Sequence, residues 1–434
     1  MRLMPAQLRT PWVPFVSAAL LFTVLVGALN GAINLWSLHV LHRGVPVEHH
    51  QSHAIAQLFG FMWLLTAGVS FHLAPRLFGA ALPSPKLVRL VAIPGIVGVT
   101  LLVLGRLGNL LPGSRWLGVL GAVSLVAAMA PWVRFVWSRY RARTVVGDWL
   151  PMFVMAGAFW WLLATVTLFA WQLGQSIGGP FARVPFELVT ASALFGGTVS
   201  WVLGVTLRAG ACAMRIERAS AKRQRIAFIA WQLAATLLVV QGAFLFESWT
   251  RAVPLAAGLC LIVVIAMVRP FQRAHEASMP NEPLLRVALV AAWAFAAVAA
   301  VLFLWQGAAV LGVPQPALLK DAARHAFTLG FTQLAVFGFA GRMLPGFEGV
   351  SMPSRGLYDA GVLALIAGAA LRVFSILSPW KPAMVASGVS GGLALIGVGL
   401  VSWCFFRTMR EGSRMRRAHS TGLSSLHLRA PVGA

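Results

Sequence analysis

The feature that most limits this fold is a series of twelve apolar segments that takes up almost the whole sequence. A helix needs about 20 apolar residues to cross the roughly 30 Å hydrocarbon core of a bilayer. A closed β-barrel also spans membranes, but its strands alternate apolar and polar residues, and these segments do not. The sequence therefore predicts an all-α polytopic membrane bundle of about 12 helices. The predicted spans are 14–36, 52–73, 88–105, 116–137, 149–172, 186–207, 226–247, 252–268, 287–311, 323–343, 357–378 and 383–406.

Composition excludes an ordinary water-soluble enzyme. Of the 434 residues 59% are hydrophobic and 11% are charged, whereas soluble domains carry about 25% charged residues. The longest polar stretches, 208–225 and 269–286, are no longer than ordinary loops. We therefore expect one transmembrane domain over residues 1–418 and a basic cytoplasmic tail over residues 407–434.

The formal charge of +24 predicts how the chain sits in the bilayer. In a soluble protein this excess of Lys and Arg would suggest nucleic acid, but here the basic residues lie in short loops, where they contact anionic headgroups. About three quarters of the 35 fall on the side that holds both termini, which the positive-inside rule assigns to the cytoplasm. Three scattered cysteines, Cys212, Cys260 and Cys404, suggest neither a disulfide framework nor a thiolate metal site.

An internal repeat of four helices runs through the chain. The second, sixth and tenth spans share a short word of Leu, Phe and Gly and end on an arginine, at nearly equal intervals. This pattern predicts three pseudo-symmetric four-helix units, at about 14–137, 149–268 and 287–406. The alternative is that charge bias alone places an arginine at each cytoplasmic end. The words and arginines are Leu58-Phe59-Gly60 with Arg76, Leu194-Phe195-Gly196 with Arg208, and Leu329-Gly330-Phe331 with Arg342.

Histidines inside the spans are the main chemical signal, because an ionisable residue within a membrane is costly and is usually functional. His53 and His325 lie near the outer ends of the second and tenth spans, at similar depth. Two imidazoles on facing helices suit an octahedral iron held between them, so the pattern predicts one haem b with two histidine ligands. The alternative is that each imidazole only bonds a neighbouring helix.

Five further residues are candidates for the haem pocket. Gly60 and Gly330 lie one to two turns inward of the two histidines and would let a flat macrocycle approach the backbone. Gln57 lies one turn from the first histidine, on the same helix face, and could orient a ligand or bond a propionate. Arg324 and Arg372 are at the outer face, either as counter-ions of the propionates or as interfacial anchors.

Five further histidines lie near one or the other end of the second span. His72 lies near its cytoplasmic end, too far from the outer histidines to share their site. His49 and His50 belong to the first outer loop, together with His39, His42 and Glu48. This cluster is a candidate copper or zinc site, although a solvated loop explains it as well.

Two stretches of the sequence resemble the signatures of the NnrS family. The first is His53-Ala-Ile-Ala-Gln57-Leu-Phe-Gly-Phe61, continuing to His72-Leu-Ala-Pro75-Arg76, and the second is Arg324-His325-Ala-Phe-Thr-Leu-Gly-Phe331, continuing to Gly341-Arg342-Met-Leu-Pro345. The family consists of twelve-span bacterial membrane proteins that carry haem and copper and are linked to denitrification and to defence against nitric oxide. The resemblance implies location in the bacterial inner membrane, a role with nitric oxide, and a membrane or periplasmic electron-transfer partner.

More distantly, the same stretches resemble the catalytic subunit of haem–copper oxidases. That subunit has twelve helices in three pseudo-symmetric groups, and a histidine on helix 2 and one on helix 10 hold its low-spin haem. The resemblance implies the same role for His53 and His325.

This chain departs from both patterns. Ile55 stands where the NnrS signature commonly has a second histidine. The oxidases also need histidines on helices 6, 7 and 10 for copper and a second haem. Here the sixth span offers Glu187 and Thr190, and the seventh offers Gln232 and Gln241. We therefore expect a protein that does not reduce oxygen, and whether it is an enzyme stays open.

Two other classes fit the topology. A twelve-span secondary transporter is one, with polar residues in the spans lining a path, although the acidic residues that coupled carriers keep at mid-membrane are missing. A non-catalytic subunit of a membrane redox complex is the other. The polar residues in question are Asn30, Asn34, Gln172, Gln232, Gln241 and Gln333.

Overall fold

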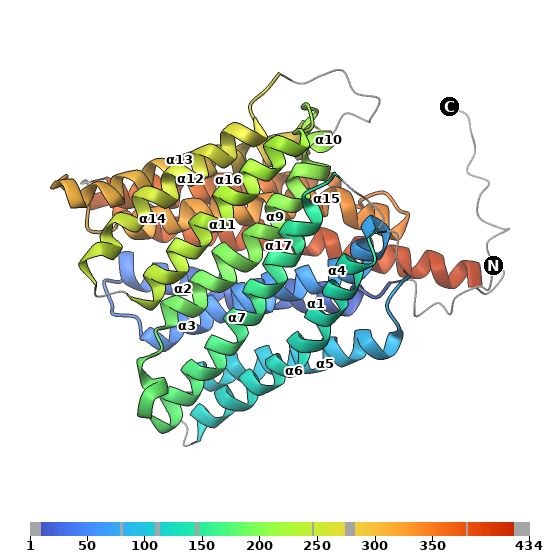
Figure 1. Ribbon diagram of the computed structural model, residues 1–434, viewed down its shortest axis with the longest axis horizontal. Helices are drawn as coiled ribbons and strands as arrows, with labels where there is room; N and C mark the ends of the chain where they lie inside the picture. Colours follow the sequence, from blue (N-terminus) through green and yellow to red (C-terminus); the bar gives the residue numbers. More distant parts are fainter. Residues whose placement is uncertain are drawn as a thin grey trace.

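The computed structural model describes residues 10–78, 81–108, 113–143, 147–244, 247–273, 283–378 and 381–420, and over these the secondary structure is helical, with no strand. Figure 1 shows the helices running side by side in one bundle. The α-helices are α1 (Val13–Phe22), α2 (Leu29–His39), α3 (Val47–Ile55), α4 (Leu64–Phe78), α5 (Pro85–Leu107), α6 (Ser114–Arg141), α7 (Leu150–Ile177), α8 (Phe186–Ala191), α9 (Val199–Val205), α10 (Ala211–Met214), α11 (Ala221–Ala243), α12 (Val253–Val268), α13 (Pro283–Gly307), α14 (Leu319–His325), α15 (Leu334–Glu348), α16 (Arg355–Leu377) and α17 (Lys381–Ser420).

Twelve stretches of these helices are long and apolar enough to cross a membrane, and each overlaps one predicted span. The prediction of a twelve-span helical membrane protein is thus confirmed. In chain order, span 1 is α1 with α2, span 2 is α3 with α4, spans 3 to 5 are α5, α6 and α7, span 6 is α8 to α10, spans 7 to 9 are α11, α12 and α13, span 10 is α14 with α15, and spans 11 and 12 are α16 and α17.

Three of the twelve spans form the centre of the bundle. The most apolar stretch of span 2 is 78% buried within the protein, that of span 6 is 78% buried, and that of span 10 is 72% buried, while no other span exceeds 56%. These three are the spans that carry the repeated Leu, Phe and Gly words. Small and aromatic side chains therefore mark the central helices, because a helix surrounded by protein must pack on every side.

The remaining spans repeat the same packing three times. The last two helices of each group of four lie against each other, as α5 with α6, α11 with α12, and α16 with α17. Glycines allow close backbone approach in two of these pairs: a methyl group on Gly98 would lie 2.8 Å from the Gly121 carbonyl, and one on Gly397 would lie 2.8 Å from the Gly361 carbonyl. The fold is three pseudo-symmetric four-helix units, as predicted.

Each central span also contains a π-helical segment: Ala56–Trp63 in span 2, Ser192–Thr198 in span 6 and Ala326–Gln333 in span 10. Threonine hydroxyls support two of these wide turns. Thr198 donates to the Ala193 carbonyl at 3.0 Å, and Thr332 donates to the Phe327 carbonyl at 2.9 Å, five residues earlier in each case. π-Helical turns are rare and often lie at functional sites. Each of these three segments contains the repeated Leu, Phe and Gly word of its span.

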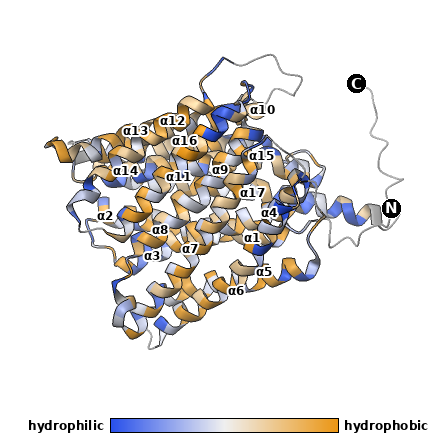
Figure 2. Ribbon diagram, in the orientation of Figure 1, coloured by the Kyte–Doolittle hydropathy of each residue, from blue (hydrophilic) through white to orange (hydrophobic). Residues whose placement is uncertain are grey.

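The two ends of the bundle carry different residues. The end where α2 finishes and α3 and α14 begin is called the histidine face, because His39, His53 and His325 lie near it. The opposite end holds Arg76, Arg208 and Arg342 and is called the arginine face. Hydrophilic residues gather towards the helix ends, most densely near α4, α10 and the end of α17 (Figure 2). The predicted basic tail continues α17 as far as Ser420, and residues 421–434 lie outside the described residues.

Candidate functional site

His53 and His325 occupy equivalent places in spans 2 and 10. His53 lies six residues after Val47, where α3 begins, and His325 lies six residues after Leu319, where α14 begins. At about 1.5 Å per residue, both are roughly 9 Å along their helices from the histidine face. The π-helical segment follows almost directly in each span. Each histidine thus lies at the same distance from the start of its own central helix.

The His53 ring is fixed by span 1. Its Nδ1 lies 2.7 Å from the carbonyl oxygen of Gly27. Because a carbonyl can only accept, Nδ1 carries the proton and Nε2 keeps its lone pair. Gly31 lies one turn further along span 1, and a methyl group there would be 2.7 Å from the Cε1 of the ring. The two glycines, four residues apart, let span 1 approach the imidazole closely.

The His325 ring is fixed by its own helix. Its Nδ1 lies 3.0 Å from the backbone oxygen of Asp321 and 3.2 Å from the Oδ1 of the same residue. Both oxygens are acceptors, so Nδ1 is again the protonated nitrogen, and in the neutral ring Nε2 carries the lone pair. Asp321 lies one turn before the histidine, which brings the two side chains to the same face of α14.

The donor chemistry of the two rings fits a haem iron. Histidines that bind metal through Nε2 almost always donate Nδ1–H to a carbonyl or a carboxylate, which fixes the tautomer and the ring orientation. His53 and His325 both meet this requirement, with different acceptors.

Arg372, on span 11, is buried beside this pair and has a counter-ion inside the protein. Its NH2 lies 2.5 Å from the Oδ2 of Asp321, and its NH1 donates to the hydroxyl of Ser387 and to the Nε2 of His39. The side chain is 6% exposed. The charge that we expected to pair with haem propionates is thus balanced by Asp321, and a haem-binding role for Arg372 stays a prediction.

The other predicted pocket residues have contacts of their own. The Oε1 of Gln57 accepts a hydrogen bond from Thr23 at 3.0 Å, and the side chain lies against Gly27. A methyl group on Gly60 would meet the side chain of Phe22, and one on Gly330 would meet that of Phe295. These two glycines therefore admit aromatic rings of neighbouring helices at the places where we expected a macrocycle. Arg324 is exposed.

The predicted loop cluster of histidines is arranged differently from our expectation. His49 and His50 lie on α3, because that helix begins at Val47, directly after Pro46, with Glu48 in its first turn. The Nε2 of His39 accepts from Arg372 and is therefore occupied. Among the residues that the structure describes, no three His, Cys, Asp or Glu side chains come together as a metal ion would require. A copper or zinc site at His49 and His50 has no third ligand there.

His72 lies near the arginine face of span 2, as predicted, and is 5% exposed. Its ring packs on that of Phe347 in span 10, with 4.0 Å between the ring centres. Arg76 donates to the backbone oxygen of His72 at 2.7 Å, so it holds the end of its own helix. His72 thus belongs to the packing between spans 2 and 10, at the end opposite to the paired histidines.

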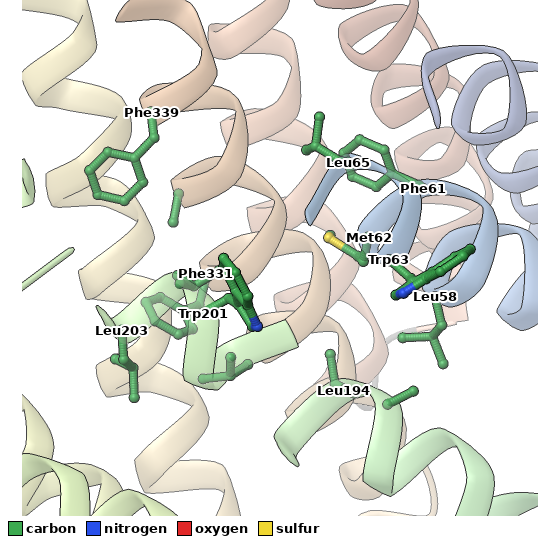
Figure 3. Close-up of a cluster of buried hydrophobic side chains, with 14 of the residues drawn as sticks. Leu58, Phe61, Met62, Trp63, Leu65, Leu194, Trp201, Leu203, Phe331 and Phe339 are labelled. Atoms are coloured by element: carbon green, nitrogen blue, oxygen red, sulfur yellow. The ribbon is translucent and has the colours of Figure 1, made fainter. Parts of the chain in front are cut away.

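Large apolar side chains of spans 2, 6 and 10 form a buried cluster within the bundle (Figure 3). Trp201 stacks on Trp132 at 6.0 Å, and Trp231 stacks on Phe327 at 5.7 Å, measured between ring centres. The labelled side chains of Figure 3 come from all three spans: Leu58, Phe61, Met62, Trp63 and Leu65 from span 2, Leu194, Trp201 and Leu203 from span 6, and Phe331 and Phe339 from span 10.

The polar residues of span 7 are used for packing. The Oε1 of Gln232 accepts from the Trp160 indole at 2.8 Å, and its Nε2 donates to Ser200 at 3.0 Å. Gln241 donates to the Thr250 backbone oxygen at 2.9 Å. Both amides therefore join neighbouring helices to one another.

Sequence reasoning missed Gly27, Gly31, Asp321, Ser387 and the contact of His39. Two signals were present in the sequence. Gly27 and Gly31 form a Gly-x-x-x-Gly motif, which marks close helix contacts in membranes. Asp321 stands four residues before His325, the spacing at which helix side chains meet. The expected start of span 10 at residue 323 left Asp321 outside the helix and hid that relation.

Comparison with known proteins gives the fold. No family model matches the sequence, and no curated protein is detectably similar in sequence. Among solved structures, the chain is similar to one described as a haem–copper terminal oxidase dimer, determined by cryo-electron microscopy, with a TM-score of 0.69 and 12% sequence identity. The match covers 94% of this chain and 84% of that one. This protein is a twelve-span helical membrane bundle with the fold of a haem–copper oxidase.

Proposed function

We propose that the chain binds one haem b between spans 2 and 10, with His53 and His325 as the two axial ligands. The observation that carries the proposal is the state of the two rings: both donate Nδ1–H to oxygen acceptors of the protein and so keep a basic Nε2. The similarity in fold to a haem–copper oxidase supports it, since both histidines lie on central helices.

A haem held by two neutral imidazoles supplies one-electron exchange between ferric and ferrous iron. The protein's part is to hold and orient the ligands. Gly27 and Asp321 fix the two rings, and Gly31 leaves room for the first of them. The site lies near the histidine face, which we assign to the periplasmic side, so it is accessible to a membrane or periplasmic electron-transfer partner. Both termini are then cytoplasmic, in a bacterial inner membrane.

The visible spectrum of the purified protein tests this proposal. We expect a Soret band and the sharp α and β bands of a reduced six-coordinate haem, and we expect His53→Ala and His325→Ala each to abolish them. His72→Ala is the matched control, because His72 is a buried histidine at the other end of span 2. A protein without a Soret band, or a His53→Ala/His325→Ala variant with an unchanged one, would overturn the proposal.

The resemblance of the two histidine-containing stretches to the NnrS family extends the proposal to nitric oxide. We propose that the protein serves in the response to nitrosative stress or in denitrification. Addition of nitric oxide to the dithionite-reduced protein tests whether the iron takes part directly. A shifted Soret band, as displacement of one histidine produces, supports nitric oxide as a ligand, whereas an unchanged spectrum leaves electron transfer as the role of the haem.

Four of the six polar residues that could line a transport path bond to other parts of the protein instead. Gln172 accepts from the buried Arg106, while Gln232 and Gln241 join neighbouring helices. Asn30 donates to the backbone oxygen of His49 and to the hydroxyl of Ser52. These four side chains stabilise helix contacts. We therefore favour the haem protein, as an electron carrier or as the haem subunit of a redox complex.

A further inference from the structure

The two candidate iron ligands have different partners at Nδ1. His53 donates to a neutral backbone carbonyl, that of Gly27, while His325 donates to Asp321, which presents a carboxylate as well as a backbone oxygen. We propose that Asp321 is a positioning residue that makes His325 the stronger electron donor to the iron, and that Arg372 moderates this effect through Asp321. The inference rests on the proposed haem site.

The Asp321 carboxylate bridges two groups with its two oxygens. Oδ1 lies 3.2 Å from the Nδ1 of His325, and Oδ2 lies 2.5 Å from the NH2 of Arg372. A shift of the carboxylate towards one partner therefore changes its contact with the other. This arrangement couples the imidazole of span 10 to the guanidinium of span 11 through one side chain.

The position of Arg372 is fixed by residues from two further spans. Ser387 of span 12 and His39 of span 1 both accept from its NH1. Because the side chain is 6% exposed and the guanidinium is always protonated, Arg372 keeps a buried positive charge beside Asp321. Spans 1, 10, 11 and 12 thus meet at one ion pair that contacts the imidazole of His325.

The charges predict opposite effects on the iron. A carboxylate that accepts from Nδ1–H increases the electron density of the imidazole, which stabilises ferric relative to ferrous iron and lowers the midpoint potential. Arg372 draws electron density from the same carboxylate and so weakens the effect. Removing the acid should raise the potential, and removing the arginine should lower it.

Redox titration of the purified, haem-loaded full chain tests the inference. Asp321→Asn keeps the size and an acceptor oxygen but removes the charge, and we expect an upward shift of the midpoint potential. Arg372→Gln should shift it downward. In the Asp321→Asn background, Arg372→Gln should change the midpoint potential little further, because the carboxylate through which Arg372 acts has been removed. Additive shifts, or an Asp321→Asn potential equal to or below that of the wild type, would overturn the inference.

Asp148→Asn is the matched control. Asp148 also pairs with two arginines, Arg208 and Arg218, but at the arginine face. The haem of the Asp148→Asn variant should therefore have the midpoint potential of the wild type. If Asp321→Asn does not retain haem, Asp321→Glu is the second test. Recovery of haem with a midpoint potential near that of the wild type supports the proposed role of the negative charge at this position. Failure to recover haem contradicts that role. Absence of a Soret band from the wild type would instead refute the proposed function, so the two failures are distinguishable.

Discussion

A methyl group on Gly31 would lie 2.7 Å from the Cε1 of His53, closer than two non-bonded carbon atoms approach one another. We predict that Gly31→Ala pushes the ring from its place, lowers the haem content and costs about 1–3 kcal/mol of stability through overpacking. Haem per protein and the midpoint of thermal unfolding in detergent measure both effects.

Gly392→Ala is the control for that variant. It also adds a methyl group to a glycine of a transmembrane helix, but into open space, so haem content should stay at the wild-type level. Equal haem in Gly31→Ala and Gly392→Ala would show that span 1 does not constrain the His53 ring.

At this scale the sequence points to the candidate haem ligands more readily than to the groups that hold them. His53 and His325 stand out because a histidine in an apolar segment is costly. The acceptor of His53 is harder to identify from the sequence, because Gly27 contributes only a backbone oxygen from another span, and that contact depends on how spans 1 and 2 pack. Arg372 shows the same limit, because its ion pair with Asp321 joins residues of different helices.

At the scale of the helices, hydropathy could not predict the π-helical segments. An apolar segment shows that a helix crosses the membrane, but the change from α to π turns depends on local carbonyl contacts such as that of Thr332. The lengths and order of the spans, by contrast, follow from the number of apolar residues. Span ends were less accurate: α3 and α14 begin at Val47 and Leu319, several residues before the expected starts at 52 and 323.

Thr332→Val tests the support of the π turn that follows His325. The valine keeps the shape of the side chain but removes the hydroxyl that bonds the Phe327 carbonyl, in a fully buried position. We expect destabilisation of about 1–3 kcal/mol, the cost of an unsatisfied buried group, seen as a lower unfolding midpoint in detergent.

Thr236→Val is the comparison for this change. Thr236 makes a similar bond to the Gln232 backbone oxygen, but in an ordinary α-helix and in an exposed position. The unfolding midpoint of Thr236→Val in detergent should remain near that of the wild type. If both variants lose the same stability, the hydroxyl has no special role in the π turn.

For the whole molecule, an ion pair at the arginine face joins the end of α17 to the rest of the bundle. Arg416, in the extension of α17, pairs with Glu348, the last residue of α15, whose side chain is fully buried. Removing one partner of a buried pair leaves an uncompensated charge and costs about 3–5 kcal/mol. We predict that Arg416→Ala lowers the unfolding midpoint clearly, whereas Arg414→Ala, at an exposed position of the same helix, does not.

A second change separates the lost charge pair from lost packing. In Glu348→Gln/Arg416→Ala the buried group is neutral, so a large part of the stability should return. A double variant as unstable as Arg416→Ala alone would show that the end of α17 stabilises the bundle through packing contacts and not through the ion pair. The visible spectrum should remain that of the wild type in each of these variants, because the pair lies at the arginine face.

The number of haem groups per chain tests the central claim most directly. The account predicts one haem b per polypeptide in the pyridine haemochrome assay of the purified wild type, and none in His53→Ala/His325→Ala. One haem is expected because His53 and His325 together supply the two axial ligands of a single iron. A value of two would contradict a single haem site, and a value of zero would contradict the site itself.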